Sequence, residues 1–532
     1  MKISGVRGVC ARLPHKSADK RRLAAALAIA ATLATASPVM AQKSQDTLRV
    51  AIASMFGVLD PYHFVSDENA QFYRTIYGSL VEFDQRKRVF FPSLAKSFKR
   101  IDNMTLEFEL RENVKFHNGN PFDASDVKVT FDYVGDPKVN LMFKARFDWV
   151  KEVEILGPHK IRLHANRLNA TDLFNLAYHM KILDGETLNA LEAKADYGRL
   201  TPVATGPYKI LYVDRNKGVL VERFDGFYGH KPYYRAPVKR VQGIPIPDRQ
   251  TQKAQLMTGG VDLLRNITGD DAESLAGEKN LAVTYAPSGQ MLFVTLDAVG
   301  RSGNKVMTDE RVRKAFIMAI DREKLVRQML PGGENAEIPN GICLTSTENC
   351  VISSKPYTYD PAQARRLLAE AGYPNGFDLT LSVFQQFSYF GEAIAGELRK
   401  VGIRASLEPL PVSVYMKKRG NGELTAFHGV NYTAAMPTMS NSMDVFFGAN
   451  RDYYKDPLIL KALEDGAIEF DSVTRDRVYG PAIDRVNEQA YILPIAEVPM
   501  AWGHTKEVKV LPNTITVFSP HLGDYAWSDY KD

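Results

Sequence analysis

The chain has 532 residues, of which 45% are apolar and 24% charged, a composition typical of a globular protein with two or three domains. Residues 1–41 carry 7 of the 67 Lys and Arg and 1 of the 62 Asp and Glu, so the remainder holds 60 basic and 61 acidic side chains, a net charge near −1. The formal charge of +5 therefore belongs to the N-terminus, and it gives no support for nucleic acid or an acidic membrane surface as a partner.

Residues 1–41 have the three parts of a secretory signal peptide: a basic start, an Ala- and Leu-rich apolar stretch at 23–36, and an A-x-A-like cleavage site at 39–41. A membrane anchor is the alternative, but it needs roughly 20 apolar residues. We expect cleavage before Gln42 and a free periplasmic product. Lys20-Arg21-Arg22 leaves a twin-Arg export route open, and no Cys follows the cut to carry a lipid anchor.

The first predicted elements are a buried strand at 47–53 and a strand-turn-helix corner at 105–133. Three apolar side chains alternate with charged ones, as in a half-buried strand: Leu106, Phe108 and Leu110. The letters HNGNP predict a turn, which His117 is expected to hold by hydrogen bonds, and Asp123 predicts a helix N-cap. By itself this pattern indicates an ordinary structural corner.

This corner contains the run LR-x-x-V-K-F-H-N-G-x-P-F-x-A-x-D-V, which resembles the signature of the extracytoplasmic solute-binding proteins of the peptide/nickel/opine class, the receptors of ABC importers. Other runs similar to that family lie before and after it in family order, at residues 54–62, 76–84, 91–97, 204–209, 227–232, 246–248, 255–263, 309–325 and 359–373. The resemblance implies an α/β protein with the two-lobed periplasmic-binding-protein fold (type II, large three-domain variant). It also implies mixed β-sheets flanked by helices and a ligand cleft between the lobes.

On this basis residues 42–85, 204–292 and 500–532 are expected to form lobe I, 86–203 an inserted extra domain on its side, and 293–499 lobe II. Within lobe II, Thr308 is expected to cap a helix on which Arg311, Arg313 and Lys314 face solvent. Asp360, Pro361 and Gly372 mark the ends of another helix. A strand at 377–383, a helix at 391–401 and a strand at 403–407 predict a β-α-β unit with parallel strands.

Cys343 and Cys350 remain after removal of the signal peptide, with six residues between them. In an oxidising compartment such a pair predicts a disulfide that staples a small polar loop. A metal pair is the alternative, but the other ligands of a tetrahedral site are missing.

The known catalytic motifs are missing from the sequence: there is no G-x-S-x-G elbow, H-E-x-x-H, Walker loop or dinucleotide-binding glycine run, and the ten histidines are scattered. The sequence therefore predicts a binding protein that is not an enzyme and needs no cofactor. A secreted enzyme or folding factor on the same scaffold would need a nucleophile-base pair that is not visible.

The region expected to bind ligand departs from that of the peptide-binding members, which hold the α-ammonium with an Asp in a stretch similar to G-W-x-x-D-x-x-D-P. Residues 429–437 (GVNYTAAMP) keep the Gly and the Pro, but Val430, Thr433 and Met436 replace the Trp and the acids. A buried ammonium without a carboxylate costs several kcal/mol. Residues 384–390 also lack the Arg that can hold a dipeptide carboxylate, so an ordinary zwitterionic dipeptide is disfavoured.

The expected lining instead combines flat apolar surface with neutral hydrogen-bonding groups, and its candidates are Gln385, Gln386, Phe387, Tyr389, Asn431, Tyr432 and Thr433. The resemblance adds Met55, Phe56 and Gly57 from the first cleft loop. The alternative for the aromatic residues is that some of them pack the lobe. Such a lining suits a peptide-like, opine-like or glycoside-like solute, for example a modified or blocked peptide.

The resemblance implies three partners: a small organic solute, and the permease and ATPase subunits of an ABC importer at the inner membrane. The protein itself is expected to be a monomer. A nickel or metallophore receptor of the same family is the alternative, although no His/Cys/Asp cluster has ligand spacing, and no metal site is predicted.

Overall fold

The computed structural model describes residues 46–53, 59–63, 67–84, 87–141, 143–200, 202–229, 236–432, 436–511 and 521–531. The predicted signal peptide lies outside these residues. Residues 41–532 form one compact unit.

The larger of two main sheets has seven strands in the order β12-β18-β11-β1-β10-β9-β8. Their bounds are β1 Thr47–Ile52, β8 Tyr208–Asp214, β9 Gly218–Arg223, β10 Arg240–Pro245, β11 Leu263–Arg265, β12 Leu281–Ala286 and β18 Met500–Thr505. β1 runs parallel to β10 and β11, whereas β18 runs antiparallel to β11 and β12. The sheet is therefore mixed, and the predicted first strand is confirmed as β1.

The second main sheet has five strands in the order β15-β14-β16-β13-β17. Their bounds are β13 Gln290–Leu296, β14 Phe377–Phe384, β15 Ile403–Leu410, β16 Ala426–Tyr432 and β17 Ile492–Glu497. β14 is parallel to β15 and β16, as the predicted β-α-β unit requires, and β13 is antiparallel to both β16 and β17.

A third sheet has the order β4-β5-β7-β6, and two hairpin-like pairs are separate, β2-β3 and β19-β20. Their bounds are β2 Val81–Asp84, β3 Val89–Pro92, β4 Ala95–Asp102, β5 Thr105–Leu110, β6 Val150–Gly157, β7 Lys160–Ala165, β19 Val508–Val510 and β20 Tyr525–Trp527.

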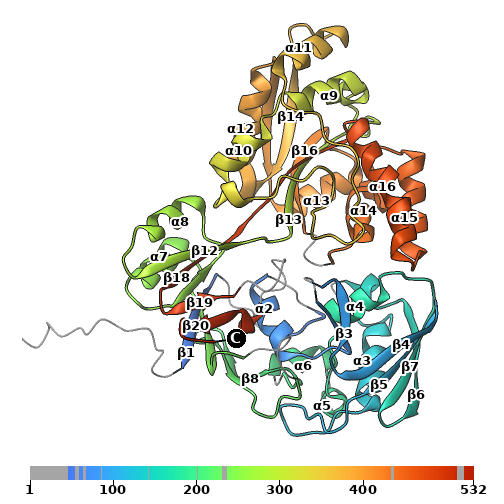
Figure 1. Cartoon of the computed structure of the whole chain (residues 1–532), viewed down its shortest axis with the longest axis vertical. Helices are drawn as coiled ribbons and strands as arrows, with labels where there is room; N and C mark the ends of the chain where they lie inside the picture. The colour runs from blue at the N-terminus through green and yellow to red at the C-terminus, as the bar shows by residue number, and fades with distance from the viewer. Residues whose placement is uncertain are drawn as a thin grey trace, which may run out of the picture. The chain divides into compact units, whose positions relative to one another are not determined.

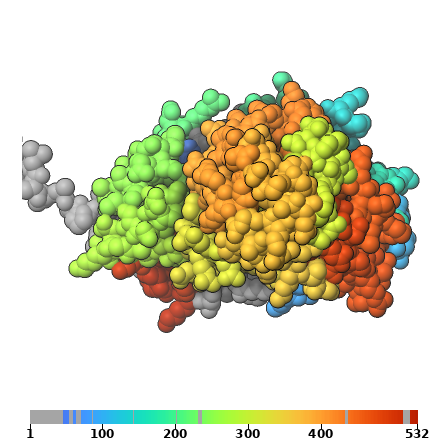
Figure 2. Space-filling model, turned by 90° about the horizontal axis from the view of Figure 1, so that it is seen from above, coloured from blue at the N-terminus to red at the C-terminus, as the bar shows by residue number. Residues whose placement is uncertain are grey.

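Helices flank these sheets (Figure 1). Those that precede the second main sheet are α2 Asp67–Ile76, α3 Ala124–Gly135, α4 Asp172–Tyr178, α5 Gly185–Ala190, α6 Tyr197–Leu200, α7 Arg249–Met257 and α8 Gly269–Ala276. Those that lie in the sequence between its strands β13 and β17 are α9 Glu310–Met318, α10 Arg322–Met329, α11 Pro361–Glu370, α12 Ser388–Arg399, α13 Val412–Asn421, α14 Met439–Phe447, α15 Pro457–Ile468 and α16 Ser472–Glu488. In Figure 2 the yellow-to-orange surface of this later group lies at the centre of the view and the green surface of α7 and α8 lies to one side.

The described residues form two large hydrophobic cores, one around each of the two main sheets. The first core takes side chains from residues 48–286 and 500–527, and the second takes them from residues 291–496. Met436 belongs by sequence to the second region but packs into the first core. The chain crosses between the cores at residues 287–289 and again at 498–499, immediately before β13 and after β17.

The predicted corner is confirmed. Leu106, Phe108 and Leu110 are buried on β5, and the Asp123 side chain caps α3 by accepting from the Ser125 backbone N–H at 2.7 Å. The ring Nε2 of His117 lies 3.0 Å from the Gly206 carbonyl, so the turn is tied to the returning chain before β8. Burial lowers the pKa of His117 to about 4, which keeps the ring neutral and structural at neutral pH.

The start of α9 corrects one prediction. Asp309, not Thr308, is the N-cap, because the Asp309 side chain accepts from the Arg311 N–H at 2.8 Å. Arg313, which was expected to face solvent, is 3% exposed. Its guanidinium donates to the carbonyls of Gln489 and Met307 at 3.0 and 2.9 Å. Gln489 lies 176 residues further along the chain, and Met307 lies in the turn before α9. Helical spacing shows neither acceptor, so it placed Arg313 wrongly.

The predicted disulfide between Cys343 and Cys350 is present, with a Cα–Cα distance of 5.9 Å. The loop that it closes is bonded to the chain after β16, because the Glu348 N–H donates to the Pro437 carbonyl at 2.7 Å. It also reaches the first half of the chain, where Arg88 Nη2 donates to the Thr345 carbonyl at 2.6 Å.

Replacing both cysteines by serine is expected to lower the free energy of unfolding by about 2–3 kcal/mol, because the cross-link limits the unfolded chain only over a short loop. Urea denaturation of the oxidised protein, with and without a reductant, measures this. The reductant should destabilise the wild type and leave the double variant unchanged; equal midpoints for all four samples would contradict the staple.

Candidate functional site

The two main sheets present the same kind of edge to each other. In the first sheet the parallel strands β1, β10 and β11 end on the side where β12 also ends and β18 begins. In the second sheet β14, β15, β16 and β17 end on the side where β13 begins. Both crossovers join these carboxyl edges, and α/β proteins bind ligands just outside such edges. The space between the two edges is therefore the candidate ligand cleft.

Several contacts join the part of the chain that forms the first core to the part that forms the second core. The Ala170 N–H donates to the Ala467 carbonyl at 3.0 Å, and the Arg100 guanidinium lies over the Phe470 ring at 4.5 Å. Together with the Arg88–Thr345 bond and the packing of Met436 into the first core, these contacts hold the edges against each other.

Residues 385–389 follow the carboxyl end of β14, where residues 385–387 form a 3₁₀ turn, η6 (Gln385–Phe387), that leads into α12. Gln385 and Gln386 are exposed, and Tyr389 is 39% exposed. Phe387 is buried, and its ring lies 6.1 Å from that of His428 on β16. Phe387 thus packs inside the protein against β16, which is the alternative considered for the aromatic residues. The side-chain amides of Gln385 and Gln386 are exposed beyond the carboxyl end of β14.

Asn431 lies near the carboxyl end of β16 and is 1% exposed, yet neither its Oδ1 nor its Nδ2 has a hydrogen-bond partner among the described residues. Buried amides are normally bonded, and an unpaired one costs about 1–3 kcal/mol. Successive strand residues face opposite sides, so Asn431 shares the face of Phe427, which packs on Tyr415, and not that of His428. Asn431 and Phe387 therefore lie on different faces of the sheet.

An Asn431→Leu variant tests whether this amide serves a ligand. Because the substitution removes two unpaired polar atoms, we expect a free energy of unfolding equal to or above that of the wild type. Solute affinity should fall about tenfold or more, because the ligand loses hydrogen bonds in a desolvated site. The control is Asn421→Leu on the exposed end of α13. Unchanged affinity in calorimetric titrations would remove Asn431 from the site.

The remaining predicted positions lie wholly or partly outside the described residues: Met55, Phe56, Gly57 and Thr433 are not described, and of Tyr432 only the backbone is. They remain predictions. Their strands are placed, since β1 ends just before the first group and β16 just before Thr433.

Three further residues have no signal in the amino-acid sequence: Trp502, Arg146 and His179. Trp502 is the third residue of β18 at the same edge, 5% exposed, and its Nε1 has no partner in the part of the chain that the structure describes. Arg146 comes from a 3₁₀ turn and His179 from the residue after α4. None of them lies in a periodic pattern or motif, so composition and spacing could not have identified them.

A pocket of about 670 Å³ lies against α3 and α5, with His63, Tyr133 and Lys194 in its lining. Tyr133 Oη is 3.1 Å from Nε2 of His63, whose Nδ1 is 2.8 Å from Asp60. These three side chains are therefore hydrogen-bonded to one another.

Comparison with known proteins identifies the class. The family of bacterial extracellular solute-binding proteins, family 5 (middle part), matches residues 90–454. The chain belongs to this family, which confirms the resemblance found in the sequence. Its members are the solute-binding components of ABC importers and deliver their ligands to a membrane permease.

Among its relatives, the glutathione-binding protein GsiB of Pectobacterium atrosepticum is 25% identical over 530 residues, which cover 94% of this chain and 98% of that protein. The substrate-binding protein CtaP of Listeria monocytogenes has a similar structure, with a TM-score of 0.79 and 17% identity over 91% of this chain and 99% of that one. NikA of Brucella suis, solved with Fe(III)-EDTA, also has a TM-score of 0.79, with 22% identity over 90% of this chain and 99% of NikA. The fold is thus the two-lobed periplasmic-binding-protein fold, as predicted.

Among the described residues, no group of three or more His, Cys, Asp or Glu side chains is arranged to hold a metal ion. Likewise, within these ranges no helix has the length and apolar character needed to span a bilayer.

Proposed function

We propose that this solute-binding protein captures an organic solute between the carboxyl edges of its two main sheets and carries out no chemistry on it. The observation that supports this most strongly is Asn431, a buried amide with both polar atoms unpaired at one of those edges. A ligand that bonds this amide would stabilise the closed arrangement of the lobes, and closure on the ligand is how such hinged proteins signal that they are loaded.

We assign residues 42–85, 204–292 and 500–532 to lobe I, 86–203 to the inserted domain and 293–499 to lobe II. The distribution of the two cores and the positions of the two crossovers support this division. In the same proposal a signal peptide ending at residue 41 directs export to the periplasm, where a monomer without a lipid anchor meets the permease and ATPase subunits of its importer.

For the solute we propose a peptide-like, opine-like or glycoside-like molecule contacted by Gln385, Gln386, Tyr389, Asn431, Tyr432 and Thr433, with Met55, Phe56 and Gly57 on the opposite edge. Phe387 belongs to this group through its packing beneath Tyr389, at a ring distance of 6.4 Å. The relatives named for glutathione binding support a modified peptide as a first candidate. No acid stands at 433 or 436 to hold an ordinary α-ammonium group.

Isothermal titration of the chain from residue 42 onward tests this function. The probes are glutathione, an α-linked dipeptide and nickel(II)-histidine. We expect one-to-one binding of glutathione or a related modified peptide, weak binding of the dipeptide, and an unchanged ligand mass after incubation. Preferential binding of the nickel complex, or turnover of the ligand, would contradict the proposal.

A further inference from the structure

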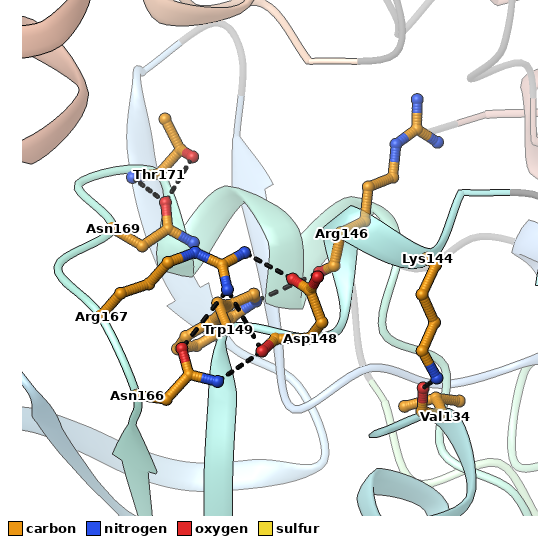
Figure 3. Close-up of polar contacts among 9 residues, drawn as sticks. All are labelled: Val134, Lys144, Arg146, Asp148, Trp149, Asn166, Arg167, Asn169 and Thr171. Carbon is orange, nitrogen blue, oxygen red and sulfur yellow. Dashed lines mark hydrogen bonds and ion pairs between the residues drawn. The ribbon is translucent and has the colours of Figure 1, made fainter. Parts of the chain in front are cut away.

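Two side-chain amides that follow β7 show how such groups are normally satisfied within a protein. Asn169 Oδ1 accepts from the backbone N–H and the hydroxyl of Thr171 at 3.1 and 2.8 Å, and Asn166 Nδ2 donates to the Asp148 carbonyl at 2.5 Å (Figure 3). Asn431 differs from both, because neither its Oδ1 nor its Nδ2 has a partner among the described residues although the side chain is 1% exposed.

A second unpaired group lies on the same face of the second sheet as Asn431. The Tyr415 ring, on α13, packs on Phe384 of β14 and Phe427 of β16, with ring centroids 4.2 and 6.0 Å away. Its hydroxyl stands over Gly429, because a Cβ at that residue would lie only 2.7 Å from Tyr415 Oη. Tyr415 is buried, and its Oη has no hydrogen-bond partner in the part of the chain that the structure describes.

The third unpaired group comes from α14. Phe446 of this helix packs edge-on against Phe293 at 4.8 Å, and Phe293 is paired with Gly429 across β13 and β16. Ser442 precedes Phe446 by one turn, so both side chains lie on the same side of the helix. Ser442 is fully buried, and its Oγ likewise lacks a partner within the described ranges. The helix therefore presents a third unpaired hydroxyl toward the face of the sheet that carries Asn431.

The spacing along β16 places two of these groups one water molecule apart. Gly429 and Asn431 are two residues apart on one face, so their Cα atoms are roughly 7 Å apart. The Tyr415 hydroxyl stands above the first residue and the amide above the second, and a water bonded to both groups spans about 5–6 Å. A buried water typically makes about three hydrogen bonds to polar groups that are otherwise unpaired. Tyr415, Asn431 and Ser442 supply three such groups.

The chemistry of Tyr415 sets the direction of these bonds. Burial raises the pKa of Tyr415, so the hydroxyl keeps its proton and donates it to the water. The water then has two hydrogens to donate, for which Asn431 Oδ1 and Ser442 Oγ are acceptors. An amide whose oxygen accepts from the inner side turns its Nδ2–H2 group outward, toward the carboxyl edge of the sheet.

We propose that Tyr415, Asn431 and Ser442 enclose one ordered water molecule, and that Tyr415 acts through this water as a positioning residue that directs the Asn431 N–H groups at an acceptor oxygen of the solute. The inference rests on the proposed receptor function and adds a criterion for its ligand. Because an N–H group only donates, the part of the solute that meets Asn431 must accept. A peptide carbonyl meets this criterion and an ammonium group does not.

The first test of this proposal needs no ligand. It compares crystal structures of the wild type and Tyr415→Phe at a resolution that shows ordered water. In the wild type we expect one water within about 3.2 Å of both Tyr415 Oη and the Asn431 amide, and in Tyr415→Phe we expect that water to be lost or displaced. A wild-type structure without this water, or with Asn431 bonded directly to another residue, would overturn the proposal.

The second test measures solute retention by immobilised proteins from a periplasmic metabolite extract, with denaturing release and mass spectrometry. The matched control for Tyr415→Phe is Tyr453→Phe. The Tyr453 ring packs on the same Phe427 at 4.9 Å, but its hydroxyl donates to the Arg419 carbonyl at 2.9 Å. Tyr453→Phe should therefore lower the melting temperature and leave retention unchanged. Tyr415→Phe should retain roughly fivefold less solute without a lower melting temperature.

A double variant separates positioning from a general structural role. In an Asn431→Leu background, Tyr415→Phe should reduce retention no further, because the hydroxyl acts only through the amide. Additive losses in the double variant, or full retention by Tyr415→Phe alone, would overturn the positioning role and leave the receptor function standing. If the wild type itself retains no solute, the receptor function is wrong, and the crystal structures still decide whether the water is present.

Discussion

An Asp262→Ala variant is expected to lose about 3–5 kcal/mol of unfolding free energy, because it leaves Arg49 as an unpaired buried charge. Arg49 Nε and Nη2 lie 3.0 and 2.7 Å from the two oxygens of Asp262, and the Arg49 backbone N–H donates to the same carboxylate at 2.8 Å. The two side chains are 7% and 0% exposed. The pair joins β1 to the start of β11, so it holds the strands that lead into the cleft.

The second sheet offers a matched control for this variant. Asp378 and Arg404 are directly paired across β14 and β15 at 2.6 Å, but they are 83% and 52% exposed. Exposed pairs contribute about 1 kcal/mol or less, so Asp378→Ala should barely shift the urea midpoint. Similar shifts of the urea midpoint for Asp262→Ala and Asp378→Ala would show that burial does not determine how strongly the Arg49–Asp262 pair stabilises the protein.

Stability should also depend on the ionisation of Glu497, the last residue of β17. Burial, with a further contribution from the charge of Glu337, raises the Glu497 pKa to about 7. The folded protein therefore holds a proton that the unfolded chain releases near pH 4.5. The stability linked to this proton is complete below about pH 4.5 and is lost as the pH rises through 7.

A Glu497→Gln variant is expected to match the wild type near pH 4.5 and to exceed its unfolding free energy by roughly 3 kcal/mol at pH 8. In the wild type, Glu497 Oε1 accepts a hydrogen bond from the Gly289 N–H at 2.7 Å. The amide oxygen of Gln can accept the same bond. Urea denaturation at a series of pH values measures the difference, with Glu464→Gln on the exposed face of α15 as the control. If the unfolding free energies of Glu497→Gln and the wild type change in parallel with pH, the ionisation of Glu497 does not control stability.

Much of the fold was predictable from the sequence because local and global signals agree there. The corner at 105–133 combines strand alternation, a turn with Gly119 at φ +97° and a capped helix, and each signal is satisfied within a few residues. The helix from Pro361 to Glu370 likewise has its Asp360 cap and Gly372 at φ +94°. Arg313 was predicted wrongly because its acceptors, one from the distant Gln489 and others from the turn before α9, are not visible in helical spacing.

The candidate site was less predictable than the fold. Strand ends could be located from the sequence, so residues 385–389 and Asn431 were found at the carboxyl edge of the second sheet. Their division between two faces of that sheet follows from the register of β14 and β16, which pairs Val383 with His428. Arg146 and His179 meet only because the 3₁₀ turn at Lys144–Arg146 and the end of α4 pack together, and no short-range pattern encodes that contact.

Native mass spectrometry of the protein from a periplasmic preparation, followed by denaturing release, tests the central claim most directly. We predict the mass of a protein chain that begins at Gln42, and one retained organic solute of defined mass. An ordinary α-linked di- or tripeptide would contradict the argument from Val430 and Thr433. A retained metal ion without an organic ligand would contradict the organic-solute function itself.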